Sequence, residues 1–224
     1  MERQAFIWDL DGTLLDSYEI IASSLMQMLL EIGIAAPQQS ILRYIVNNSV
    51  NEFIGGIANE TNIAFEQLKR RYSEISKRRN VEVKPIMNAK NILEYLSSLG
   101  VNNFVYTHKG ETADSVLQNI GLRHFFTEVV TSKNGFERKP NPEAIFYLME
   151  KYHLSEERTF YVGDRRIDVE CARNARIKSI LYLAMTSCVE IDGTEDYIVH
   201  DLLEIRKIVS VQPQNQENGN IEIN

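Results

Sequence analysis

The spacing of apolar residues changes once along this chain, and the change separates an all-helical block from a region of alternating strands and helices. A short apolar run at residues 5–8 predicts a buried strand. From about residue 16 to residue 80, no run has the pattern of a strand. Apolar residues there recur every three or four positions, which is the spacing of a helix with one buried face. The predicted helices span residues 17–32, 38–46, 49–59 and 64–79.

Strands and helices alternate beyond Pro85. The predicted strands span residues 102–106, 127–131, 159–163, 178–183 and, more briefly, 197–199. The predicted helices between and after them span residues 88–99, 111–120, 143–152, 167–175 and 201–209. Short strands that alternate with helices of this length are typical of a parallel sheet with helices on both faces. The sequence therefore predicts an α/β, Rossmann-like core with an all-helical insertion.

The two patterns also predict where the chain passes between domains. We expect a catalytic core from residues 1–16 plus 83–210, and a helical cap from residues 17–82. Asp16 and Glu19 have the spacing of a capping box, which predicts that the first cap helix begins just after Asp16. Residues 211–224 are polar and lack core residues, so we expect a mobile tail.

The composition excludes some classes of function. The chain has 224 residues, 44% hydrophobic residues and a net charge of −7. An acidic chain is a poor match for general nucleic-acid or membrane-surface binding, so an anionic ligand would need a local cationic pocket. The chain has no leader-like start, no membrane-spanning run and no disulfide or zinc spacing at its two cysteines. We therefore expect a cytoplasmic protein, either a monomer or a weak dimer.

Candidate chemistry begins directly after the first strand, where Asp9 and Asp11 flank one residue and precede Gly12. Two carboxylates this close repel each other unless a cation or a shared proton compensates. A carboxylate can also attack phosphorus, while a neighbouring one moves the proton. Mg²⁺ prefers such oxygen ligands. The four-residue pattern alone also fits a calcium loop or a simple turn.

Other polar residues stand at the ends of later strands. Asp164 follows the strand at residues 159–163 and is the candidate third acid for a metal, with Asp168 one helical turn further on. Thr107 offers a hydroxyl after another strand, and Lys139 offers a positive charge in a loop that Pro140 restrains. Ligands of parallel sheets bind beyond the carboxyl ends of the strands, which is where these residues are expected. Four further residues are expected at the pocket rim: His108, Lys109, Arg165 and Arg166.

These residues, in this order, resemble the haloacid dehalogenase superfamily over nearly the whole chain except the tail. The matching motifs are Asp-Leu-Asp-Gly-Thr-Leu-Leu-Asp-Ser at residues 9–17, Thr107, Lys139-Pro140, and Gly163-Asp164 with Asp168. The helical block is similar to the cap of the phosphoglycolate phosphatase and β-phosphoglucomutase branch. The resemblance implies a core strand order of 5-4-1-2-3, with the Asp9 strand between those of Thr107 and Asp164.

The resemblance also implies a role for each residue. Asp9 would be the nucleophile and Asp11 the general acid and base. Thr107 and Lys139 would bind the transferred phosphoryl group. Mg²⁺ would be held by Asp9, by Asp164 and by the backbone carbonyl of Asp11. We place Asp168 behind these ligands, as a partner that supports them.

Two residues depart from the family pattern. His108 stands where many relatives have asparagine, and we count it with the phosphate-binding residues. Arg176 stands where relatives commonly have glycine, which suits a left-handed helix end. Arginine would either cost about 1 kcal/mol in that conformation or change the helix ending.

The leading prediction is a Mg²⁺-dependent phosphatase that acts on a small phosphorylated metabolite. A phosphomutase of the β-phosphoglucomutase type is the alternative, although Thr13 is more typical of the phosphatases. A dehalogenase is disfavoured by the presence of Asp11. A non-catalytic protein that binds metal or phosphate is a remote alternative, since the full catalytic set is present.

Substrate specificity is expected from the cap. The polar segment between two predicted cap helices includes Asn47 and Asn48, and either could face the substrate. Arg43 could meet a substrate carboxylate. Each of these three residues fits an exposed helix surface equally well or better. The sequence does not identify the phosphate ester.

Overall fold

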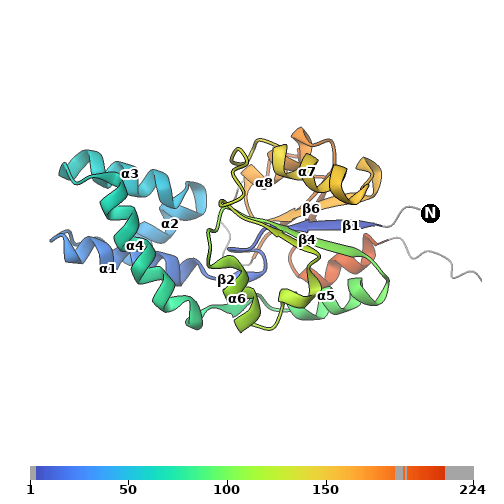
Figure 1. Cartoon of the computed structure of the whole chain (residues 1–224), viewed down its shortest axis with the longest axis horizontal. Helices are drawn as coiled ribbons and strands as arrows, with labels where there is room; N and C mark the ends of the chain where they lie inside the picture. Colours follow the sequence, from blue (N-terminus) through green and yellow to red (C-terminus); the bar gives the residue numbers. More distant parts are fainter. Residues whose placement is uncertain (1–3, 185–188, 190, 210–224) are drawn as a thin grey trace, which may run out of the picture.

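A six-stranded parallel sheet lies at the centre of the protein (Figure 1). The computed structural model describes residues 4–184, 189 and 191–209, so the predicted mobile tail at 211–224 lies outside the described residues. The sheet contains β1 (Ala5–Trp8), β4 (Asn102–Tyr106), β5 (Glu128–Val130), β6 (Thr159–Gly163), β7 (Lys178–Tyr182) and β8 (Tyr197–Val199). Its order is β5-β4-β1-β6-β7-β8, which places β1 between β4 and β6.

The predicted parallel sheet is confirmed, but the predicted strand order is one strand short. Counted along the chain, the observed order is 3-2-1-4-5-6, which is the predicted order seen from its other edge with one strand added. The added strand is β8, which pairs in parallel with β7 from Tyr197 opposite Ile180.

Helices cover both faces of the sheet. The face with α5 (Ala89–Ser98), α6 (Ala113–Asn119) and η4 (Leu202–Lys207) buries Phe6 and Trp8. The face with α7 (Glu143–Tyr152) and α8 (Arg166–Asn174) buries Ala5 and Ile7 (Figure 1). Successive side chains of a strand point to opposite faces, so the all-apolar run of β1 serves both cores. Three short 3₁₀ helices complete this part: η1 (Asn80–Glu82), η2 (Arg123–Phe125) and η3 (Glu156–Arg158).

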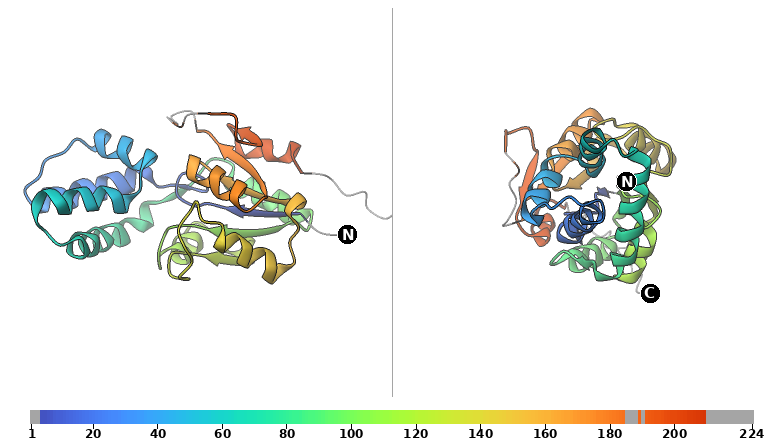
Figure 2. Two further views of the ribbon diagram at one scale, coloured as in Figure 1. Left: turned by 90° about the horizontal axis from the view of Figure 1, so that it is seen from above. Right: turned by 90° about the vertical axis from the view of Figure 1, so that its left-hand side faces the viewer.

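The helical block is set apart from the sheet, as Figure 2 shows. It contains α1 (Tyr18–Glu31), α2 (Gln38–Asn47), α3 (Val50–Thr61) and α4 (Phe65–Arg79). These helices have their own buried cluster, which includes Leu25, Met28 and Leu68. The chain enters and leaves the block through a short antiparallel pair, β2 (Leu15–Asp16) and β3 (Lys84–Pro85). None of the helices in the described part is long and apolar enough to cross a bilayer.

Two local expectations about helix ends had different outcomes. The predicted capping box of Asp16 and Glu19 is wrong, because Asp16 pairs with Lys84 in the β2–β3 ladder. Ser17 caps α1 instead, without a side-chain capping bond. After α8, Arg176 does adopt the left-handed conformation, with φ of 59°.

Candidate active site

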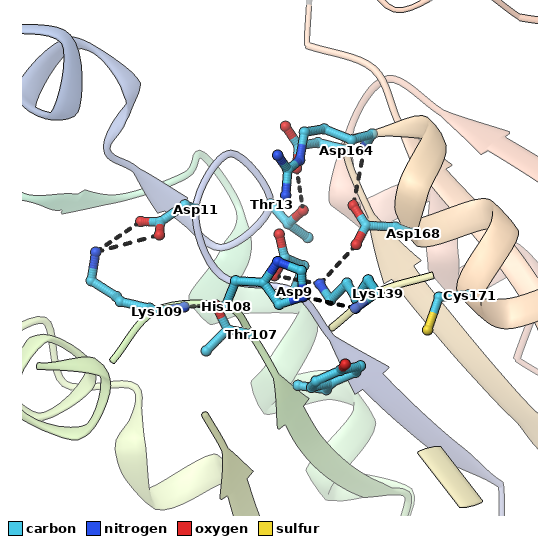
Figure 3. A network of polar contacts seen from close by, with 12 residues as sticks. Asp9, Asp11, Thr13, Thr107, His108, Lys109, Lys139, Asp164, Asp168 and Cys171 are labelled. Carbon is cyan, nitrogen blue, oxygen red and sulfur yellow. Dashed lines mark hydrogen bonds and ion pairs between the residues drawn. The ribbon is translucent and has the colours of Figure 1, made fainter. Parts of the chain in front are cut away.

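Three loops converge at one edge of the sheet (Figure 3). Asp9, Thr107 and Asp164 follow β1, β4 and β6 directly, and these strands are neighbours in the sheet. All three side chains are buried. Parallel strands place their carboxyl ends together, so this topology brings residues from distant parts of the sequence into one site.

The turn after β1 requires glycine. Gly12 has a φ of +86°, a conformation that other residues rarely adopt. A Cβ atom there would also overlap the Asp164 carboxylate and the Tyr18 ring. Gly163 is similarly restricted, since a Cβ atom would overlap the Asp168 side chain. The two glycines therefore allow the acidic side chains to approach the backbone closely.

Lys139 forms ion pairs with two of the acids, Asp9 and Asp168. Its Nζ atom lies 2.8 Å from Oδ1 of Asp9 and 2.8 Å from Oδ1 of Asp168. The lysine side chain is fully buried. Burial alone would lower the pKa of Lys139, but Asp168 and Asp9 hold that pKa above its usual value. The lysine is therefore a fixed cation beside the Asp9 carboxylate.

The carboxylates of Asp9, Asp164 and Asp168 have oxygen atoms within 4.8 Å of one another. Burial and the neighbouring Asp168 charge raise the pKa of both Asp9 and Asp164, which Lys139 partly offsets at Asp9. Asp168 has both oxygens engaged, one by Lys139 and one by the backbone N–H of Arg165 at 3.2 Å. Asp164 also accepts hydrogen bonds at both oxygens, but its partners are the neutral hydroxyls of Thr13 and Tyr18 rather than a lysine. The charge of Asp164 is therefore less compensated than that of Asp168, and oxygen donors of this kind fit Mg²⁺.

Asp11 lies outside this carboxylate group. Its Oδ1 atom accepts hydrogen bonds from Lys109 Nζ at 3.0 Å and from Ser17 Oγ at 2.7 Å. Burial alone would raise the pKa of Asp11, but Lys109 and Ser17 hold the pKa below its usual value. A carboxylate beside Asp9 that is kept ionised in this way can accept a proton.

Thr107 and His108 complete the side opposite Asp164. The Thr107 hydroxyl oxygen accepts from the Lys109 N–H at 3.1 Å, so its hydrogen remains available to a ligand. His108 Nε2 lies 2.9 Å from the Lys139 backbone N–H, which donates to it. Burial, together with Lys139, Arg138 and Arg165, lowers the pKa of His108 to about 2. His108 is therefore neutral in the folded protein.

A cavity of about 660 Å³ extends from these residues to the helical block. Asn48 lines it, whereas Arg43 and Asn47 do not. The reason is the phase of α2, because Ile41 and Ile45 are buried one turn apart and place Arg43 and Asn47 on the outer side. Of the predicted specificity residues, the structure brings only Asn48 to the cavity.

Two contacts of the site were not anticipated from the sequence. Tyr18, the first residue of α1, donates its hydroxyl to Asp164 Oδ2 at 2.7 Å, and Lys109 forms an ion pair with Asp11. Of the four residues expected at the rim, His108, Lys109 and Arg165 line the cavity, whereas Arg166 does not. No local sequence pattern identifies such partners, since they lie up to 146 residues apart along the chain.

Comparisons with known proteins agree with this geometry. The family model described as haloacid dehalogenase-like hydrolase matches residues 6–182. A phosphoglycolate phosphatase of Vibrio cholerae serotype O1 is 29% identical over 178 residues, which cover 75% of this chain and 79% of that protein.

Solved structures are similar as well. A hydrolase from Streptococcus pneumoniae TIGR4 is 32% identical, with a TM-score of 0.61, and the match covers 83% of this chain and 95% of that one. A predicted phosphoglycolate phosphatase from Haemophilus somnus 129PT has a TM-score of 0.82 at 23% identity, covering 93% and 98%. The second likeness shows the fold. The resemblance inferred from the motifs is confirmed.

Proposed function

The chain belongs to the haloacid dehalogenase-like hydrolase family, and from that premise we propose that it is a Mg²⁺-dependent phosphatase. It hydrolyses a small phosphorylated metabolite through an aspartyl-phosphate on Asp9. The observation that carries this proposal is the meeting of Asp9, Asp164 and Lys139 at the carboxyl edge of the sheet. A nucleophile, a cation for phosphate oxygens and oxygen donors for a metal are the groups that phosphoryl transfer needs.

The donor set supports Mg²⁺ as the metal. Asp9 and Asp164 would hold the ion with their carboxylates, and Asp11 with its backbone carbonyl, while Asp168 keeps Lys139 in place. Mg²⁺, when bound, supplies positive charge that offsets the negative charge of the acids and of the phosphoryl oxygens. On the Asp164 side, the charge of Arg165 only partly offsets the burial and the neighbouring acids that raise the pKa of Asp164, so a metal ion there would relieve the remaining repulsion among the three acids.

In the first step, an Asp9 carboxylate oxygen attacks phosphorus and the bond to the leaving oxygen breaks. Lys109 and Ser17 keep Asp11 ionised in the free protein by lowering its pKa, so Asp11 takes up a proton when the substrate binds and then gives that proton to the leaving oxygen. The leaving group departs as an alcohol. Lys139 and the Thr107 hydroxyl bind the phosphoryl oxygens as their charge is redistributed. The products of this step are the aspartyl-phosphate and the free alcohol.

In the second step, a water molecule attacks the phosphorus atom of the aspartyl-phosphate. Asp11, now deprotonated, takes a proton from that water, and the bond between phosphorus and the Asp9 oxygen breaks. Inorganic phosphate leaves, Asp9 returns to its starting state, and Asp11 keeps the proton for the next leaving group or releases it to solvent. The same Asp11 therefore serves as acid and then as base.

The helical block at residues 17–82 is proposed as a cap over this chemistry. It supplies one wall of the cavity, through Tyr18, Asn48, Tyr72 and Ser73. Lys77 of α4 also forms an ion pair with Glu111 beyond β4. Closing of such a cap would exclude water during the first step, and the β2–β3 crossing is the place for the hinge.

The substrate is proposed to be a short phosphate ester, with 2-phosphoglycolate as the first compound to test because the relatives carry that name. A cytoplasmic location and a monomer or weak dimer remain predictions. Light scattering after gel filtration measures the oligomeric state.

The experiment is a Mg²⁺-dependent assay with p-nitrophenyl phosphate and a panel of phosphorylated metabolites. Wild-type protein should release phosphate, EDTA should abolish the release, and Asp9→Asn should lower the rate by at least about 1,000-fold. The matched control is Asp114→Asn, a half-exposed aspartate on α6 that should keep the wild-type rate. Equal rates for wild type and Asp9→Asn would refute the assignment.

A further inference from the structure

The cavity collects positive charge although the chain is acidic. Its lining includes the cations Lys69, Lys77, Lys109, Lys133, Arg138 and Arg165, against the acids Asp9, Asp11, Glu111 and Glu137. The whole chain has a net charge of −7. Such a local excess of cations favours a strongly anionic ligand.

Three of these six cations already have acidic partners. Lys109 pairs with Asp11, Lys77 pairs with Glu111, and the charge of Arg165 is opposed by the buried acids around Asp164. Arg138, like Lys69 and Lys133, forms no ion pair with a carboxylate of the described residues, but it alone of these three contacts His108. Its nearest polar partner is a nitrogen atom of His108, with Nη2 lying 2.9 Å from Nδ1.

The contact between Arg138 and His108 lacks a hydrogen-bond acceptor. A neutral imidazole has one N–H group and one nitrogen that can accept. His108 faces two obligatory donors, the Lys139 backbone N–H at Nε2 and the Arg138 guanidinium at Nδ1. Whichever ring nitrogen carries the hydrogen, one of these contacts sets a donor against a donor. A protonated ring would leave both contacts unsatisfied.

An anionic oxygen beside Arg138 would remove this mismatch. With Nε2 accepting from Lys139, the Nδ1–H group and the guanidinium are free to donate to the same oxygen or to two oxygens of one group. A guanidinium also matches the two oxygens of a carboxylate or phosphate in a paired arrangement. Both residues line the cavity, so a ligand within it can reach them.

The position of Arg138 relates this second group to the reacting one. Arg138 is the chain neighbour of Lys139, the proposed phosphoryl ligand, and consecutive Cα atoms are about 3.8 Å apart. Lys139 points into the core while Arg138 is exposed to the cavity. The second anionic group would therefore lie on the cavity side of the Asp9–Lys139 pair.

Building on the proposed phosphatase function, we infer that Arg138 and His108 bind a second anionic group of the substrate, a carboxylate or a second phosphate. These two residues then determine specificity on the leaving-group side. The site selects phosphorylated acids or bisphosphates over neutral phosphate esters. It replaces Arg43, which points away from the cavity, as the candidate carboxylate ligand.

The test measures binding of three phosphonates that cannot be hydrolysed, using the full chain with excess Mg²⁺ in a calorimeter. The compounds are 3-phosphonopropionate, ethane-1,2-diylbisphosphonate and 3-hydroxypropylphosphonate, which end in a carboxylate, a phosphonate and a hydroxyl. Wild-type protein should bind at least one of the two doubly anionic compounds about tenfold or more tightly than the hydroxyl compound. The tighter of the two identifies the second group.

Variants assign this preference to its residues. Arg138→Gln should bring the affinity ratio close to one, and Arg138→Lys should retain part of it because the charge remains. Arg43→Gln is the matched control and should retain the wild-type ratio. Equal affinities of wild type for all three compounds, or an unchanged ratio in Arg138→Gln, would overturn the inference. This ratio is read without turnover, so it is independent of the phosphatase assay, whose failure would refute the proposed activity instead.

Discussion

Lys139 Nζ lies 2.8 Å from Oδ1 of Asp9, so the proposed nucleophile is held by the cation that would bind the phosphoryl oxygens. The same ammonium group contacts Asp168 on its other side. One side chain therefore offsets the negative charge of two buried carboxylates, which reduces the repulsion that an incoming anion would meet.

Replacement of this lysine should destabilise the fold. Lys139→Met leaves Asp9 and Asp168 buried without their counter-ion, and removal of one partner of a buried pair costs about 3 kcal/mol or more. Urea unfolding at neutral pH in EDTA measures the loss. Lys133→Met, at an exposed lysine of the same loop, is the control and should change the unfolding free energy by under about 0.5 kcal/mol. Equal stabilities of the two variants would contradict the role given to Lys139.

The acid role of Asp11 should depend on the leaving group. Asp11→Asn should lower turnover of an alkyl phosphate by about 100-fold or more, because an alkoxide leaves poorly without a proton. The loss in the first step should be much smaller with p-nitrophenyl phosphate, whose phenolate leaves unprotonated. Rapid-mixing measurement of the released alcohol or phenol isolates that step. The same loss with both esters would show that Asp11 does not act as the acid.

Gly12 should tolerate no side chain. In Gly12→Ala the new methyl group meets both an unfavourable φ of +86° and the Asp164 carboxylate. The comparison is Gly33→Ala, which has φ of +80° but open space around the new methyl group. Gly33→Ala should cost about 1 kcal/mol from the backbone alone, and Gly12→Ala at least about 1 kcal/mol more.

Metal binding separates the two glycine variants further. Gly12→Ala should also weaken Mg²⁺ binding, because Asp164 must shift, whereas Gly33→Ala should bind Mg²⁺ as wild type does. Chemical denaturation and calorimetric titration supply both readings. The prediction fails if the two alanine variants match in stability and in metal affinity.

His108 should make the fold less stable in acid. Its pKa is about 2 in the folded protein and near the ordinary 6.5 in the unfolded chain. The unfolded chain therefore takes up a proton below about pH 6.5 that the folded protein does not, and stability falls as the pH is lowered from there. The groups that face the ring and oppose its protonation are Lys139, Arg138 and Arg165.

Substitution of His108 should reduce this pH dependence. His108→Gln should lose about 2 kcal/mol less stability than wild type between pH 7 and pH 5. The free energies come from urea unfolding at the two pH values. His124→Gln, at an exposed histidine on η2, is the control and should retain the wild-type difference. A wild-type pH dependence in His108→Gln would mean that the ring protonates freely in the folded state.

Much of the fold and the site was predictable because both follow short-range patterns. The apolar run of β1 and the alternation after Pro85 predict a parallel sheet, and a parallel sheet places Asp9, Thr107 and Asp164 at one edge. Ligand-type residues at strand ends are visible in the sequence itself. These patterns therefore predict where the acids, Lys139 and the helical block lie in the fold.

The rest depends on side-chain directions and on very short elements. The pairing of Asp11 with Lys109 and the Tyr18 hydroxyl bond to Asp164 join residues far apart in sequence, and only the folded geometry selects them. The two-residue strands β2 and β3 are too short to have a period, so the Asp16 capping box was predicted instead. Arg43 was a reasonable carboxylate ligand by residue type, but the helical phase of α2 directs it outward.

The position of the phosphoryl group during turnover tests the central claim most directly. Asp11→Asn protein, which should form the aspartyl-phosphate and release it slowly, is mixed with Mg²⁺ and p-nitrophenyl phosphate and quenched in acid. Peptide mass spectrometry then locates the added phosphoryl group. We predict that it lies on Asp9 and that Asp9→Asn protein acquires none. A phosphoryl group on another residue, or wild-type turnover by Asp9→Asn, would contradict the account.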